Sequence, residues 1–111
     1  MKDTRKAPIF TATWDLTAWL LRQLGRDASV LANALCTEAI SLLDAVVLAL
    51  KDIDRGDNLA AADLSLIRLR MRVRLAAETG VLEERQAHFL LGQADDIGRQ
   101  LGGWLRSLDA A

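Results

Sequence analysis

The sequence contains few of the residues that build disulfide frameworks, metal sites and strand-rich folds. Its 111 residues include one cysteine, one histidine, one proline and no tyrosine. Cys36 cannot form an internal disulfide, and one cysteine with one histidine cannot supply the usual ligands of a closed zinc site. We expect Cys36 to be a small core residue of a protein in a reducing compartment.

Long apolar runs and a recognisable targeting segment are also missing. The longest continuous apolar run, residues 45–50, is much shorter than the roughly 20 residues of a membrane span. The start of the chain is basic, as in a signal peptide, but Thr11, Thr13 and Asp15 interrupt the stretch that follows. These features predict a cytoplasmic protein with no membrane partner.

Catalytic motifs are absent as well. The only histidine, His88, lies four residues after Glu84, whereas di-iron bundles repeat a Glu-x-x-His motif on two helices. Neither a G-x-S-x-G nucleophile turn nor a G-x-x-x-x-G-K-[ST] phosphate loop occurs. We therefore expect His88 to lie on the surface, and we predict that the chain is not an enzyme and holds no cofactor or metal.

The residues that are abundant favour helices. Alanine and leucine dominate, and Gly25, Gly56 and Gly80 follow three long periodic segments, where helices commonly end. This punctuation predicts helices at about 11–24, 28–54, 59–79 and 83–108, after an N-terminal arm of residues 1–10. Because the connections are short, we predict one all-α domain over residues 1–111, an antiparallel up-down-up-down four-helix bundle.

Most of the apolar stripes suit the core of such a bundle. For the first predicted helix, we expect a core stripe of Phe10, Trp14, Leu21 and Leu24. For the last, we expect a core stripe of Leu90, Ile97, Leu101, Leu105 and Leu108.

The helix predicted at 59–79 differs because it has two apolar stripes on roughly opposite sides. One stripe consists of Leu64, Ile67, Met71 and Leu75; the other consists of Leu66, Leu69, Val73 and Ala77. A helix in a small bundle usually has one apolar face, so two faces predict packing against another subunit. We assign Leu66, Leu69 and Val73 to that interface, although the periodicity does not say which stripe faces the core. The alternative is that both stripes fold into one bundle core.

The last predicted helix carries three further candidates for a subunit interface. Gly98 and Gly102 lie four residues apart on one side, and each glycine costs about 1 kcal/mol relative to alanine in a helix. Two glycines on one side predict the close approach of another backbone. Trp104, at the edge of the apolar stripe, is either an intersubunit contact or part of the core.

Two segments resemble a known family. Residues 62–76, ADLSLIRLRMRVRLA, resemble the third helix of the accessory variability determinant (Avd) proteins of diversity-generating retroelements, and residues 96–105, DIGRQLGGWL, resemble their closing helix. The same superfamily includes four-helix proteins encoded in 23S ribosomal-RNA intervening sequences. Their asparagine and glutamate motif does not occur in the second predicted helix, so this second resemblance is looser.

The resemblance implies a homo-oligomeric ring or barrel, a pentamer of four-helix bundles. It also implies a reverse transcriptase as protein partner, a positive surface that binds RNA or DNA, and no catalytic residues. The chain departs from this pattern in its charge, since 14 Lys and Arg stand against 15 Asp and Glu. Nucleic-acid affinity depends largely on clustered cations, which a net charge of -1 does not supply globally.

A local cluster of arginines has two interpretations. The residues concerned are Arg68, Arg70, Arg72, Arg74, Arg99 and Arg106. The arginines of the third helix either form salt bridges with acids such as Asp63 or Glu78, or belong to a surface for nucleic acid or a protein partner. The sequence therefore predicts a non-enzymatic oligomeric scaffold resembling the retroelement accessory protein. The alternative is a self-assembling interaction protein of the intervening-sequence superfamily without a nucleic-acid role.

Overall fold

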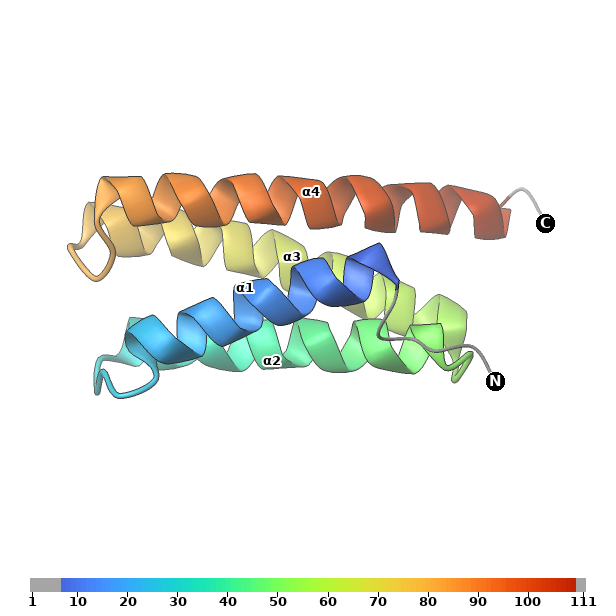
Figure 1. Ribbon diagram of the computed structural model, residues 1–111, viewed down its shortest axis with the longest axis horizontal. Coiled ribbons are helices and arrows are strands. Elements are labelled where there is room, and N and C mark those ends of the chain that lie inside the picture. The colour runs from blue at the N-terminus through green and yellow to red at the C-terminus, as the bar shows by residue number, and fades with distance from the viewer. Residues whose placement is uncertain (1–6, 110–111) are drawn as a thin grey trace.

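A computed structural model describes residues 7–109 of the chain and shows four α-helices (Figure 1). The helices are α1 (Pro8–Leu24), α2 (Val30–Leu50), α3 (Arg55–Glu78) and α4 (Glu84–Asp109). Within residues 7–109 there is no β-strand, so the predicted all-α fold of four helices is confirmed. The molecule is elongated, with extents of 44 × 24 × 20 Å.

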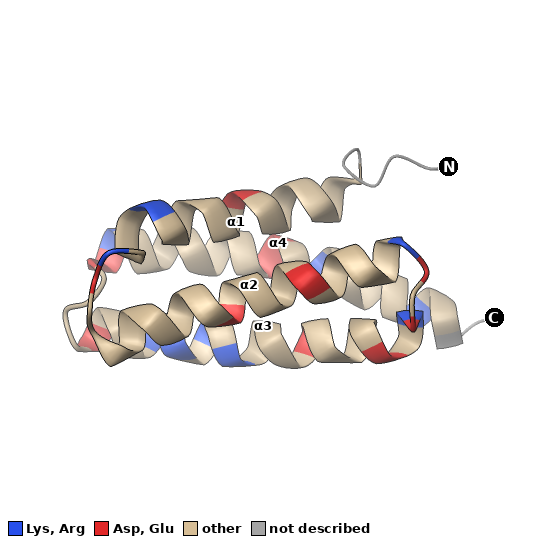
Figure 2. Cartoon of the chain, turned by 90° about the horizontal axis from the view of Figure 1, so that it is seen from below, with Lys and Arg blue, Asp and Glu red and all other residues tan. Residues whose placement is uncertain are grey.

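Consecutive helices lie side by side along the long axis of the molecule. The α1–α2 and α3–α4 connections lie at one end, and the α2–α3 connection lies at the other (Figure 1). Both α1 and α3 pack against α2 and α4, so α1 and α3 occupy diagonal positions. Figure 2 shows these two helices at opposite edges of the bundle.

The first helix begins earlier than predicted. Pro8 is in its first turn, where the fixed φ of proline suits the helix and its missing N–H is not needed. Residues 8–10 therefore belong to α1 and not to an N-terminal arm. Residues 1–6 of the predicted arm lie outside the described residues.

The second helix is shorter than the predicted 28–54, and Gly56 does not follow its end. The second helix ends at Leu50, and a tight turn follows in which Asp52 and Asp54 have φ angles of 61° and 43°. Aspartate tolerates this left-handed region better than most residues, so the turn needs no glycine. Gly56 instead lies in the first turn of α3, whereas Gly80 has the expected positive φ of 83° after α3.

At the starts of α2 and α4, side chains accept hydrogen bonds from backbone N–H groups that have no partner within the helix. The Ser29 hydroxyl accepts a hydrogen bond from the Ala32 N–H at 3.1 Å, so Ser29 caps α2. The carboxylate of Asp27 accepts from the Ser29 N–H at 2.8 Å, which supports the cap. At α4, the Gln86 side chain accepts from the Glu83 N–H at 3.0 Å, as in half of a capping box.

The buried face of α1 differs from the prediction. Trp14 and Leu21 are 54% and 42% exposed, and of the four predicted core residues only Leu24 is buried. The buried residues are Ile9, Thr13, Leu16, Thr17, Leu20 and Leu24. Both threonine hydroxyls donate to the carbonyl four residues earlier, at 2.7 and 2.8 Å, which allows them to be buried.

The core stripe of α4 is largely as predicted. Leu90, Ile97 and Leu101 are buried, and Leu105 and Leu108 are partly buried against the same core. The helix α2 is long and apolar enough to cross a membrane by length and composition alone. A core helix of a soluble bundle passes the same test, and α2 packs against both α1 and α3.

Candidate interaction surfaces

The two apolar stripes of α3 have different environments. Leu66, Leu69 and Val73 are at most 2% exposed and belong to the bundle core. Their prediction as a subunit interface is therefore wrong, because their side chains pack within the chain's own bundle. The side chains of the other stripe are roughly half exposed: Leu64 at 53%, Ile67 at 55%, Met71 at 58% and Leu75 at 47%. We call these four residues the α3 outer stripe.

On one side of this stripe, two arginines converge on a buried acid. Arg68 Nε and Arg72 Nη1 both donate to Glu38 Oε1, each at 2.7 Å. The side chain of Glu38 is only 7% exposed, while those of Arg68 and Arg72 are 46% and 30% exposed. The carboxylate, which α2 supplies, therefore links α2 to α3 and offsets part of the arginine charge.

The environment of Glu38 favours its charged form. Burial raises the pKa of this carboxyl, but hydrogen bonds from Arg68 and Ser65, with the charges of Arg68 and Arg72, outweigh burial. The pKa of Glu38 is consequently below its ordinary value of 4.5. Ser65, which is 4% exposed, is one of the few polar side chains buried in the bundle.

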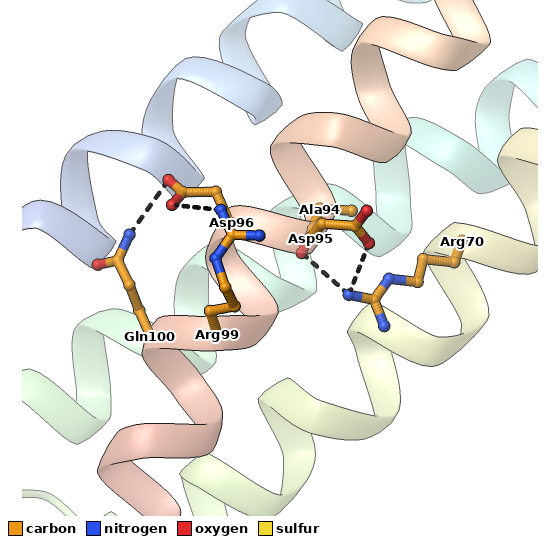
Figure 3. A network of polar contacts seen from close by, with 6 residues as sticks. All are labelled: Arg70, Ala94, Asp95, Asp96, Arg99 and Gln100. Carbon is orange, nitrogen blue, oxygen red and sulfur yellow. Dashed lines mark hydrogen bonds and ion pairs between the residues drawn. The ribbon is translucent and has the colours of Figure 1, made fainter.

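On the other side of the α3 outer stripe, Arg70 reaches across to α4. Its Nη2 donates to the Ala94 carbonyl at 3.2 Å and lies 3.2 Å from Asp95 Oδ1 (Figure 3). Asp95 is exposed, so the backbone contact with Ala94 does more than the ion pair to fix the arginine. Arg70 thus joins α3 to α4 as Arg68 and Arg72 join α3 to α2.

Gly98 provides the space that Arg70 occupies. A Cβ atom at position 98 would lie 2.6 Å from Arg70 Nη2 and 3.4 Å from Leu66 Cδ2. The close approach that the two glycines predicted thus occurs at Gly98, but it involves side chains of the same chain. The assignment of Gly98 to a subunit interface is corrected accordingly.

The other predicted arginines do not form a single cluster. Arg74 is exposed and makes no ion pair within residues 7–109. Arg99 lies 3.3 Å from Asp96 on the exposed side of α4, where Gln100 also donates to Asp96 (Figure 3). Arg106 is exposed near the end of α4, far from the α3–α4 connection that Arg74 approaches.

Of the four α3 arginines singled out from the sequence, Arg68, Arg70 and Arg72 therefore form intrachain ion pairs, in agreement with the first interpretation of the sequence. Their partners are Glu38 and Asp95, not the predicted Asp63 or Glu78. Figure 2 shows basic bands on α3 beside an acidic band on α2.

Trp104 and Gly102 lie in the C-terminal half of α4. Trp104 is partly buried against the core, and the Arg55 guanidinium lies 5.8 Å from the centre of its ring. The nearest atom to a Cβ at Gly102 would be Arg106 Nη1 of the same helix, at 3.4 Å. The intersubunit roles of Trp104 and Gly102 stay predictions.

Glu38 was not among the residues predicted from the sequence. Within α2 it is the one charged residue before Asp44, and an acid in so apolar a stretch is the signal that could have found it. His88 is exposed and Cys36 is buried, as expected, and burial raises the pKa of the Cys36 thiol. Among the described residues, no group of three or more His, Cys, Asp and Glu side chains could hold a metal ion.

Comparison with known proteins identifies the family. The sequence profile of the bAvd-like family matches residues 14–108, which is most of the chain. The chain belongs to the bAvd-like family. This confirms the resemblance to the Avd proteins that the segments in α3 and α4 suggested. No curated protein and no solved structure matches the chain.

Membership of the bAvd-like family extends beyond the two segments on which the resemblance rested. The match includes most of α1 and all of α2, for which the sequence had suggested only helix lengths and an apolar pattern. The bAvd-like chain is therefore related to its family over the whole bundle and not only along α3 and α4. The family is one of helical bundle scaffolds rather than a known enzyme family.

Proposed function

We propose that the chain is a non-enzymatic scaffold that assembles with copies of itself and binds a reverse transcriptase, as expected of a retroelement accessory protein. Copies of this up-down-up-down four-helix bundle would form a ring or barrel in the cytoplasm. The resemblance to the Avd proteins implies five copies. The function lies in the surfaces that the bundle presents to its partners.

The α3 outer stripe is the observation that carries this proposal. Four large apolar side chains, each about half exposed, follow one helix without interruption by a charge on the same stripe. Contiguous apolar surface of this kind on a small soluble protein marks an interaction site. Three of the arginines beside it, Arg68, Arg70 and Arg72, are held by Glu38 and Asp95, which reduces the net charge along the border of the stripe.

RNA or DNA is a further proposed partner, through arginines that are free of strong intrachain pairs. Arg74 and Arg106 are exposed, and Arg99 has only an exposed acid beside it. Cations in such positions neutralise phosphates without first breaking a buried interaction.

The neutralised arginines favour the alternative function, a self-assembling interaction protein that binds no nucleic acid. Arg68 and Arg72 share Glu38, and Arg70 is fixed between Ala94 and Asp95. Among the described residues, the arginines without such contacts are spread along the bundle and do not form a dense patch. In this case the bundle would serve assembly and a protein partner only.

Measurement of the absolute mass in solution tests the proposed function. Size-exclusion chromatography with light scattering should give a mass of several chains, five if the pentamer is correct. The double substitution Ile67→Asp and Met71→Asp should lower that mass to one chain while circular dichroism stays helical. A monomeric wild-type chain would contradict the proposal.

A further inference from the structure

A second apolar stripe lies on the exposed side of α1. Trp14 is 54% exposed and Leu21 is 42% exposed. Phe10, one turn before Trp14, and Ala18, between Trp14 and Leu21, are partly exposed. The rings of Phe10 and Trp14 stack with their centres 5.7 Å apart. These four residues recur at helical spacing, so they form one continuous surface, which we call the α1 outer stripe.

Nothing in the described part of the chain covers this surface. Trp14 has no role in the bundle core, which α1 contacts through Leu16, Leu20 and their neighbours. An aromatic ring that is half exposed beside another exposed apolar residue is typical of protein interfaces. The α1 outer stripe therefore needs an occupant, as the α3 outer stripe does.

The two stripes match in length and lie on different sides of the bundle. Phe10 and Leu21 are separated by as many positions as Leu64 and Leu75, so both stripes extend equally along their helices. The helices α1 and α3 are diagonal to each other and run in the same direction (Figures 1 and 2). A stripe on each of two diagonal helices cannot be covered by the same neighbouring molecule.

We propose that the α3 outer stripe of one copy docks on the α1 outer stripe of the next copy. This inference rests on the proposed function, because it takes self-assembly as given and identifies the two surfaces that meet. Such a contact is heterologous, since each copy uses one surface to bind and leaves the other free. Repetition of a heterologous contact produces a ring when the rotation closes.

The charges beside the two stripes are complementary in this arrangement. Copies related by rotation about an axis along the bundle keep their helices parallel, so Phe10 can lie level with Leu64 and Leu21 with Leu75. Asp15 then lies level with the stretch between Arg68 and Arg70, and Arg22 lies close to the level of Glu78. An acid is thus level with a base at the middle of the contact, and a base is level with an acid at its end.

The contact also brings together side chains that suit each other. Met71 is flexible and polarisable, and methionine sulfur packs favourably against aromatic rings such as those of Phe10 and Trp14. The side chain of Arg68 is 46% exposed, so its guanidinium can donate to a second carboxylate while its hydrogen bond to Glu38 remains. The second copy therefore satisfies both the apolar stripe and its charged border.

Two blocked chains test the proposal. The first carries Trp14→Asp and Leu21→Asp, which removes the α1 surface and leaves the α3 outer stripe intact. The second carries Ile67→Asp and Met71→Asp, which removes the α3 surface and leaves the α1 outer stripe intact. All four positions are at least 42% exposed, so both chains should fold, and circular dichroism checks this.

Each blocked chain alone should have the mass of one chain, because every copy in the solution lacks the same one of the two surfaces that must meet. An equal mixture of the two should contain a species of two chains, joined by the one intact pair of surfaces, and nothing larger. Sedimentation velocity at a fixed total concentration measures both results. A control chain with Val30→Asp and Leu48→Asp, at exposed apolar positions outside both stripes, should keep the wild-type mass.

The outcomes separate this inference from the proposed function. If the chain blocked on α1 keeps the wild-type mass, assembly uses another surface, and the inference is overturned while the proposed function stands. The same conclusion follows if both blocked chains are folded monomers that do not associate when mixed. If the unmodified chain is a monomer, the proposed function and this inference both fail.

Discussion

Arg70 of α3 lies directly over Gly98 of α4, where a Cβ atom would come within 2.6 Å of its Nη2. The glycine is thus matched to an arginine that crosses to the Ala94 carbonyl. A helix interior normally disfavours glycine, so the contact offsets a local cost in helix stability.

Alanine substitutions at Gly92 and Gly98, both on α4, measure how far Arg70 depends on the glycine beneath it. Gly92→Ala, where a Cβ would meet nothing within 4 Å, should raise the free energy of unfolding by about 1 kcal/mol through helix propensity alone. Gly98→Ala should gain less or should destabilise the chain, because Arg70 must move. In an Arg70→Ala background the two alanine substitutions should have similar effects. Equal gains in the unmodified background, measured by urea unfolding, would show that Arg70 does not depend on Gly98.

Removal of the charge at Glu38 should destabilise the bundle. Glu38→Gln takes away a buried carboxylate that accepts from Arg68 and Arg72, and we expect a loss of about 2 kcal/mol in the free energy of unfolding. Glu78→Gln is the matched control, because Glu78 is exposed on the same bundle and the charge change is identical. Similar urea midpoints for the two variants would rule out a stabilising role for the Glu38 ion pairs.

The contribution of Glu38 should also depend on pH. Its pKa in the folded chain is below the ordinary value of 4.5, so folding favours the charged form. The difference in stability between wild type and Glu38→Gln should therefore be complete above about pH 4.5 and should shrink as the pH falls through the lower, folded pKa. A difference that stays constant from neutral pH into this acidic range would be inconsistent with the ion pairs.

Nucleic-acid binding should involve the exposed arginines that have no buried or backbone partner within residues 7–109. Replacement of Arg74, Arg99 and Arg106 by glutamine should weaken binding to a single-stranded RNA probe. The slope of log affinity against log salt should fall by about 2, given roughly 0.7 per phosphate contact on single strands. A control in which the exposed Arg26, Lys51 and Arg85 are replaced by glutamine has the same net charge and should bind as wild type does. Wild-type binding that is absent, or insensitive to salt, would favour the alternative function.

Substitution of Trp104 tests whether this side chain makes an intersubunit contact or packs only within its own bundle. We expect Trp104→Ala to lower the assembled mass while most helix content remains, because the ring is only partly buried. Arg55→Ala keeps the ring and removes the cation 5.8 Å from it, so its mass should be unchanged. An unchanged mass for Trp104→Ala, by light scattering, would place the role of the tryptophan within its own bundle.

The sequence predicted the four helices and the two-sided character of α3, because both depend on periodicity. It could not decide which stripe of α3 is buried, since Leu66 and Ile67 are equally apolar and differ only in their neighbours. Small residues such as Ala62, Ser65 and Ala76 lie on the buried side, where they let adjacent helices approach. Weighting small residues as well as large apolar ones would have indicated the core face.

The error on α1 has a related cause. Thr13 and Thr17 count as polar in an apolar pattern, yet both are buried with their hydroxyls bonded to backbone carbonyls. Thr17 also lies within 3.2 Å of the Ala39 carbonyl of α2, a contact that depends on the packing of two helices. Likewise, the pairing of Arg68 and Arg72 with Glu38 joins residues far apart in the chain, which no local pattern reveals.

The start of α1 and the end of α4 lie at the same end of the bundle (Figure 1). In a ring whose subunits are related by rotation along the bundle axis, every chain would present these two ends on one rim. A domain fused to either terminus would then crowd that rim alone. The opposite rim, formed by the α1–α2 and α3–α4 turns, would remain accessible, so tagged chains could be immobilised in a single orientation for binding measurements.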